Sequence, residues 1–135
     1  MDLMAAIDVA ASGMRAQSAR VRVVSQNVAN ADTTAQTPEG EPYRRKLITF
    51  EQELDSATGA RKVDVASIRP EQGELPVEYD PEHPAADERG YVEQPNVDPL
   101  VELMDLREAT NSHRANLQVY EEARSMVSST RSILR

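Results

Sequence analysis

The loop from residue 79 to residue 91 contains residue types that could bind a metal ion. Its carboxylates surround His83 in the run Tyr-Asp-Pro-Glu-His-Pro-Ala-Ala-Asp-Glu-Arg-Gly-Tyr. A calcium loop needs a central glycine and a terminal glutamate, but in a loop starting at Asp80 these positions hold Ala85 and Tyr91. We therefore expect His83 to fix the loop or to face solvent, and not to bind a metal.

No other pattern predicts a catalytic centre. The two histidines, His83 and His113, lack the His-Glu-x-x-His spacing of a zinc enzyme. The sequence also has no Gly-x-Ser-x-Gly nucleophile motif and no glycine-rich phosphate loop. We expect no catalytic, cofactor-binding or metal-binding residues, and a hydrolytic or metal-dependent enzyme ranks last among the functions considered.

Charge is distributed unevenly along the chain, whose formal net charge is −8. Residues 1–37 carry three acids and three bases, residues 99–135 carry five of each, and residues 38–98 carry fifteen acids and seven bases. Binding to nucleic acid requires a basic face, so we expect no nucleic-acid partner. The one basic cluster, Arg44-Arg45-Lys46, is interpreted as a solvated strand end in preference to an anion or partner contact.

Helix-breaking residues divide the chain into three segments. All eight prolines and four of the five glycines lie between residues 38 and 99. This predicts a mainly α fold, with an N-terminal helix and loop over 1–37, a Pro/Gly-rich insert over 38–98 and a C-terminal helix over 99–135. Strand-forming residues at 43–50, 62–68 and 75–79 predict a small β-hairpin with long loops in the insert. The chain has no cysteine and no long apolar run, so we expect neither disulfides nor membrane insertion.

The N-terminal helix carries one apolar stripe, here called the N-terminal seam. Its members alternate by three and four residues, with Ala10 and the polar break Gln17 completing the pattern. A helix over 3–30 is about 42 Å long, and one stripe on such a rod needs a partner. An ordinary amphipathic helix in a small bundle would give a similar pattern. The seam residues expected at a subunit interface are Leu3, Ile7, Met14, Val21, Val24 and Val28.

The C-terminal helix has a clear predicted start. Asp98 is a suitable N-cap, Pro99 suits the first helical position, and Glu102 and Asp105 lie near the positive end of the helix dipole. A second stripe, the C-terminal seam, continues the heptad step and is also expected at a subunit interface. Its residues are Leu103, Leu106, His113, Leu117, Tyr120, Val127 and Leu134. The two helices could form a coiled-coil-like antiparallel pair within one chain, or pair with neighbouring chains.

Several motifs resemble those of a known family. Ser12-Gly13-Met14, Ala16-Gln17, Arg20 and the run Asn27-Val28-Ala29-Asn30 before Thr33 resemble the N-terminal signature of bacterial flagellar rod and hook axial proteins. The motifs of the insert are similar to those of the proximal-rod members: Pro42-Tyr43-Arg44-Arg45-Lys46, Tyr79-Asp80-Pro81, His83-Pro84, Ala86-Asp87, Gly90-Tyr91-Val92 and Pro95-Asn96-Val97. The chain departs from the family at Asn111 to Asn116, where the usual Arg-Ala-Tyr-Glu-Ala-Asn keeps only its last two residues.

The resemblance implies a structural subunit of the flagellar basal-body rod. Such proteins are exported unfolded by the flagellar type III apparatus, without a cleaved signal peptide, and assemble in the periplasmic space. The implied partners are other rod proteins, the motor-ring and export-gate adaptor at the rod base, and further copies of the chain. Long neutral helices with apolar stripes suit a tube wall built from many copies. A soluble helical adaptor that binds one partner helix remains the alternative.

Overall fold

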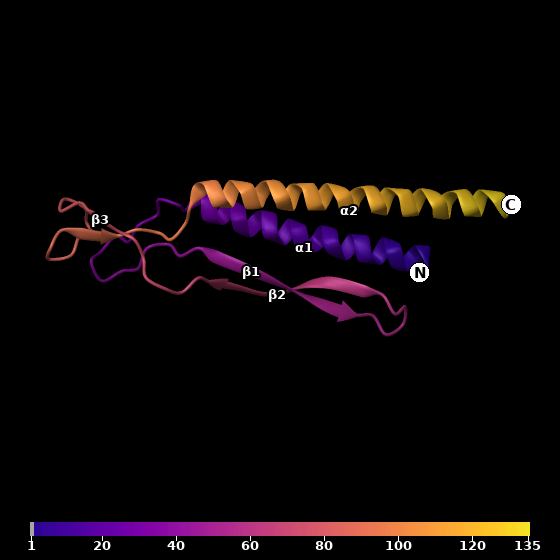
Figure 1. The fold of residues 1–135 in the computed structure, drawn as a ribbon, viewed down its shortest axis with the longest axis horizontal. Helices are drawn as coiled ribbons and strands as arrows, with labels where there is room; N and C mark the ends of the chain where they lie inside the picture. The colour runs from indigo at the N-terminus through magenta and orange to yellow at the C-terminus, as the bar shows by residue number, and fades with distance from the viewer. Residues whose placement is uncertain (1) are drawn as a thin grey trace.

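The computed structural model describes residues 2–135 as an elongated molecule with a long helix near each terminus (Figure 1). The elements in chain order are α1 (Leu3–Ala29), β1 (Lys46–Leu54), β2 (Arg61–Pro70), β3 (Val77–Tyr79), β4 (Tyr91–Glu93) and α2 (Pro99–Ile133). The prediction of a mainly α fold with a β-hairpin between two terminal helices is therefore confirmed. No helix in the described part of the chain is long and apolar enough to cross a membrane.

Polar side chains define where both helices begin. The Asp2 carboxylate accepts a hydrogen bond from the Met4 amide at 3.4 Å, and the Asp98 carboxylate accepts one from the Leu100 amide at 3.0 Å. These bonds satisfy amides that have no carbonyl partner within the helix. The predicted N-cap at Asp98, with Pro99 in the first turn, is confirmed.

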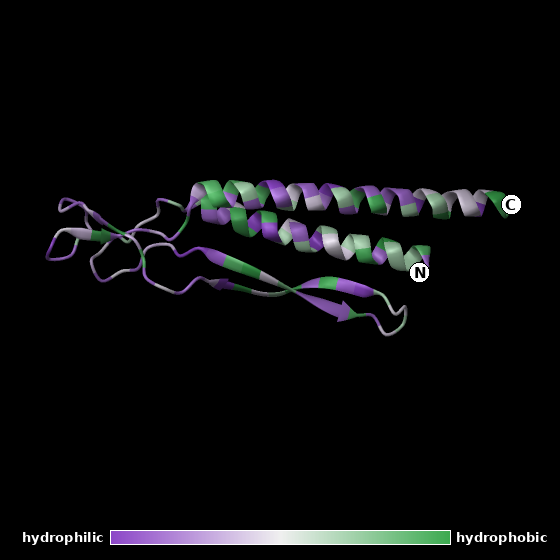
Figure 2. Ribbon diagram, viewed as in Figure 1, coloured by the Kyte–Doolittle hydropathy of each residue, from purple (hydrophilic) through white to green (hydrophobic). Residues whose placement is uncertain are grey.

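The two helices lie side by side and antiparallel, and α1 lies between α2 and the β1–β2 hairpin (Figure 1). The buried apolar residues of the two helices are mostly alanines, which allow close approach of backbones; they are Ala5, Ala10, Ala16, Val23, Val24, Ala109 and Ala123. Gly13 has the same effect, since a Cβ atom there would lie 2.7 Å from the Asn116 side chain. The helix α2 continues beyond the N-terminal end of α1, and apolar residues recur along this extension (Figure 2).

The insert contains two separate antiparallel hairpins. Strands β1 and β2 pair from Lys46 with Pro70 to Leu54 with Arg61, with a bulge between Thr49 and Phe50. The strand predicted at 43–50 is found at 46–54, and the strand predicted at 62–68 extends farther at both ends. The second hairpin, β3 with β4, lies at the opposite end of the molecule from the C-terminus (Figure 1). The sequence pattern missed β4 because this strand has only three residues, too few for an alternation to be recognised.

Candidate functional site

The most highly connected group of polar side chains lies where both helices meet the insert. We call it the polar junction, and it consists of Asn27, Tyr43, Arg45, Asn96 and Glu102. Its members come from the end of α1, the segment before β1, the approach to α2 and the first turn of α2. Helix α2 therefore begins beside the place where α1 ends.

Glu102 is a charged group at the centre of the polar junction, and it is fully buried. One carboxylate oxygen is paired with Nε of Arg45, and the other accepts a hydrogen bond from the Asn27 amide at 3.2 Å. A buried carboxylate is stable only when such partners replace its water. The sequence correctly placed Glu102 near the positive end of the helix dipole, but it did not indicate that the side chain is buried.

Asn27 satisfies its whole side-chain amide within the polar junction. Its Nδ2 donates to the Lys46 carbonyl at 3.0 Å and to Glu102, while Oδ1 accepts from the Lys46 amide at 2.9 Å and from the Tyr43 hydroxyl at 2.8 Å. An amide side chain offers two donors and two acceptor positions, so all four are used. The Asn27 side chain thus makes the two hydrogen bonds with the Lys46 backbone that a residue of a neighbouring β-strand would make.

Arg45 connects the polar junction to three carboxylates. Besides Glu102, its guanidinium lies 3.2 Å from Asp105 and 3.7 Å from Glu71. Its backbone amide donates to Asn96 at 2.7 Å. The interpretation of this basic cluster as a solvated strand end is therefore wrong for Arg45. One feature of the sequence could have indicated this pairing. Glu102 and Asp105, in the first turns of the C-terminal helix, are opposite in charge to the basic cluster Arg44-Arg45-Lys46.

Burial and charge act on the ionisation of the polar junction. Burial alone would lower the pKa of Arg45, but the hydrogen bond and negative charge of Glu102 outweigh it and raise that pKa. Burial, followed by the charge of Glu102, also raises the pKa of the Tyr43 phenol. Arg45 is therefore charged and Tyr43 neutral at physiological pH, which matches the hydrogen bonds they make.

The loop from Tyr79 to Tyr91, here called the tip, is held by hydrogen bonds within the loop and by one to Thr34. His83 Nδ1 accepts from the Ala85 amide at 3.0 Å, so Nε2 carries the proton and donates to the Thr34 hydroxyl at 3.0 Å. Within residues 2–135 no three His, Asp or Glu side chains lie close enough to hold a metal ion. The contacts of His83 are those of a residue that fixes the loop.

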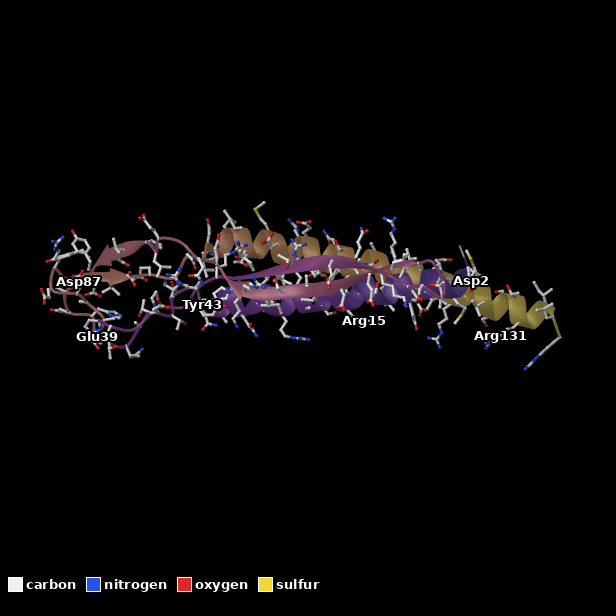
Figure 3. The ribbon with its side chains drawn as sticks, turned by 90° about the horizontal axis from the view of Figure 1, so that it is seen from below. Asp2, Arg15, Glu39, Tyr43, Asp87 and Arg131 are labelled. Carbon is white, nitrogen blue, oxygen red and sulfur yellow. The ribbon has the colours of Figure 1, made fainter. Side chains whose placement is uncertain are left out.

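Asp87 and Gly90 shape the turn of the tip, which lies at one end of the molecule (Figure 3). The Asp87 carboxylate accepts hydrogen bonds from the amides of Arg89 at 2.8 Å and Tyr91 at 2.9 Å, and such bonds lower its pKa. Gly90 has φ +86°, and a Cβ atom there would lie 2.9 Å from the Tyr79 ring. The rings of Tyr79 and Tyr91 meet edge to face at 5.4 Å.

The family-motif residues occupy three places in the fold. The α1 group links this helix to its surroundings: Ser12 accepts from the Val63 amide at 3.2 Å, Gly13 contacts Asn116, Asn27 is in the polar junction and Asn30 accepts from Thr33 at 3.2 Å. The tip contains Tyr79, Asp80, Pro81, His83, Pro84, Asp87, Gly90 and Tyr91. Pro95 is buried on the approach to Asn96. All of these positions shape or connect elements.

The predicted seam residues are not gathered in one buried core. In the N-terminal seam Val24 is only 4% exposed and packs within the chain, so this residue is not free to contact a neighbouring subunit as expected. The others are half-buried: Leu3, Ile7, Met14, Val21 and Val28. In the C-terminal seam, half-buried Leu106, His113, Tyr120 and Val127 alternate with exposed Leu103, Leu117 and Leu134. His113 lines a groove of about 290 Å³ between the helices with Ser18, Val21 and Thr110.

Comparison with known proteins identifies the family. Residues 7–35 match the model of the flagella basal body rod protein, and residues 88–133 match the C-terminal model of the flagellar basal body rod FlgEFG proteins. The flagellar basal-body rod protein FlgC of Agrobacterium fabrum is 47% identical over 98% of this chain and 96% of its own length. The chain belongs to the FlgC family. The FlgC proteins of Salmonella typhimurium and Bacillus subtilis are each 37% identical, over 96% and 90% of this chain and 96% and 91% of their own lengths.

Membership of the FlgC family decides the class of function. FlgC-family proteins are structural components of the flagellar basal-body rod, so this chain is a structural rod subunit and not an enzyme. It belongs to the flagellar basal body and assembles there with other flagellar components. The polar junction and the tip are therefore sites that shape a building block, not sites of chemistry.

Proposed function

We propose that this chain polymerises through its terminal helices into the proximal rod and transmits torque from the motor ring to the hook. In this proposal the flagellar type III apparatus exports it without a cleaved signal peptide, and it assembles in the periplasmic space. Its neighbours are other rod proteins, the motor-ring and export-gate adaptor at the rod base, and further copies of itself.

The observation that carries this proposal is the apolar surface left open on the helices of the single chain. Leu100, Val101, Leu103 and Met104 are exposed together at the start of α2. Leu117 and Leu134 of the C-terminal seam are exposed farther along the chain, Leu134 to 82%. Contiguous exposed apolar residues mark interaction surfaces in soluble proteins. A subunit that buries these residues only against its neighbours would bury apolar surface as it assembles.

The polar junction supports the torque-transmitting part of the proposal. Torque passes through a subunit only if its parts keep their relative orientation under load. Glu102, Arg45 and Asn27 join both helices to the insert by hydrogen bonds and ion pairs in a buried setting, where such bonds are least exchanged with water. The hairpin and helix pair therefore turn as one body.

A pair of leucine substitutions tests assembly through the helices. Leu134→Asp places a charge at the exposed C-terminal end of α2, so it leaves the chain folded and blocks the contact with a neighbour. The matched control is Leu54→Asp, which alters a leucine that is 64% exposed at the end of β1, outside the helices. In a host that lacks its own copy, we expect loss of swimming with Leu134→Asp only. Normal swimming with Leu134→Asp and loss with Leu54→Asp would contradict assembly through the helices.

A further inference from the structure

Each helix carries a second stripe of mostly exposed residues, distinct from its seam. In α1 this outer stripe alternates by four and three residues and consists of Met4, Asp8, Ala11, Arg15, Ser18, Arg22, Ser25 and Ala29. All of them are exposed except Ala11, which is half-buried. Residues at this spacing lie along one face of a helix. The outer stripe of α1 is therefore mostly exposed, although Asp8 lies 3.9 Å from Lys62 of β2 and Ser18 lines the groove between the helices.

The outer stripe of α2 lies in the second half of that helix. It consists of Ala115, Val119, Glu122, Met126, Ser129 and Ile133, which follow the same alternation and are all exposed. Val119 and Met126 are 53% and 52% exposed. The heptad step thus continues to the end of α2 without a partner in the chain.

The two outer stripes are complementary in size and in charge. Half of the residues in the stripe of α1 are small, whereas the stripe of α2 presents the large side chains Val119, Met126 and Ile133. Small residues on one helix form the holes that large residues of another can fill. Arg15 and Arg22, one heptad apart, are the bases of the α1 stripe, and Glu122 is the acid of the α2 stripe.

Of the charged residues of the two stripes, Asp8 of α1 lies 3.9 Å from Lys62 of β2, and the other three have no ion-pair partner among residues 2–135. None of Arg15, Arg22 and Glu122 takes part in the ion pairs formed among residues 2–135. Arg15 lies at the edge of the molecule along α1 (Figure 3). The two arginines are separated by about 10.5 Å along the helix axis, so their long side chains can flank a carboxylate placed between them.

We propose that the outer stripe of α1 in one copy packs against the outer stripe of α2 in a second copy, with Glu122 between Arg15 and Arg22. The inference rests on the proposed function, because it names one interface of the polymer. The contact joins two different surfaces, so each copy keeps one free stripe for the next. Such a heterologous contact builds an open helical array and not a closed dimer.

Charge reversal tests this interface. The Arg15→Glu/Arg22→Glu chain and the Glu122→Arg chain each place like charges in contact, and we expect about a tenfold fall in their content in purified basal bodies. A chain carrying all three substitutions pairs opposite charges again and should return to the wild-type content. Coexpression of the first two chains should also restore it, since alternating copies then match at every contact.

Controls distinguish the loss of this interface from misfolding of the variants and from a failure of the proposed function. Arg114→Glu reverses an exposed base of α2 outside the outer stripe and should leave the content unchanged. Equal helical circular dichroism of all purified variants shows that they fold. Two outcomes would show that the inference is wrong, provided that the wild-type chain is present in basal bodies. The first is a triple variant as depleted as the chains with one stripe reversed, and the second is no effect of reversing either stripe. Absence of the wild-type chain from basal bodies would instead refute the proposed function.

Discussion

At the scale of single residues, Glu102 is the position on which the fold depends most directly. Its carboxylate is shared by Arg45 and Asn27, and the residue is fully buried, so these two partners take the place of the water that would otherwise solvate the charge. Breaking a buried charge pair from one side costs more than removing the pair, because the remaining charge is left unsolvated.

We expect Arg45→Met to lower the free energy of unfolding by about 3–5 kcal/mol, because the fully buried Glu102 carboxylate then loses its charged partner. Replacing both partners, as Arg45→Met/Glu102→Leu, should cost much less than the single change. Denaturant unfolding of the purified chains measures both. Should the double variant lose as much as the sum of the two single variants, the two charges would not be coupled as described.

Asp87 gives the tip a dependence on pH. Backbone hydrogen bonds from Tyr91 and Arg89 lower the pKa of Asp87, so the folded chain favours the ionised carboxylate. Its stabilising contribution is present above the unfolded pKa of about 3.9 and is lost as the pH falls through the lower folded value. We expect Asp87→Asn to speed amide exchange at Tyr91 near neutral pH, with the difference from wild type shrinking below about pH 4.

The control for the tip is Glu88→Gln, which neutralises the exposed neighbouring acid. This variant should exchange at Tyr91 as the wild type does throughout the pH range. Equal acceleration by both variants would mean that net charge, and not the Asp87 hydrogen bonds, stabilises the tip.

At the scale of elements, the close approach of α1 and α2 depends on Gly13. Alanine is normally favoured over glycine inside a helix by about 1 kcal/mol. Here the new Cβ would lie 2.7 Å from the Asn116 side chain, and overpacking costs about 1–3 kcal/mol. The atoms that the new Cβ would meet are the far end of a flexible side chain, so we expect Gly13→Ala alone to be close to neutral, and Gly13→Ala/Asn116→Ala, which removes the clash, to be more stable than the wild type by about 1 kcal/mol. Thermal unfolding of the variants, with Ser18→Ala as the exposed control on α1, measures both effects.

A gain from Gly13→Ala alone that equals the gain from the double variant would show that Asn116 is not in contact with position 13. The same experiment bears on the departure from the family pattern at residues 111–116. Asn116 is one of the two residues kept there, and it is the one that contacts Gly13.

The helices could be predicted from the sequence because their signals are local. Asp98, Pro99 and the absence of prolines near the termini define the helical segments regardless of their neighbours. The polar junction could not be predicted, because Asn27, Arg45 and Glu102 are far apart in the sequence and meet only through the tertiary fold. The burial of Val24 within the chain could not be predicted for the same reason. A heptad pattern shows that a residue needs a packing partner, but it does not show which element supplies that partner.

At the scale of the whole molecule, the fold is a narrow bundle with most apolar burial supplied by alanines. Its largest fully buried side chains include Glu102, Asn27 and Ser12 as well as Val92, so polar contacts fix the arrangement of a chain that has few aromatic residues. Such a subunit leaves apolar helix surface for its neighbours. This arrangement suits a protein whose work is done as part of an assembly.

The most direct test is an image of this chain in isolated basal bodies at a resolution that separates helices. We predict that the antiparallel helix pair lies in the wall of the proximal rod, with the exposed seam of α2 against a neighbouring subunit, and that deletion of the chain abolishes the rod beyond it. A rod that assembles fully without the chain, or density that places its helices away from every neighbour, would contradict a structural role for the helix pair.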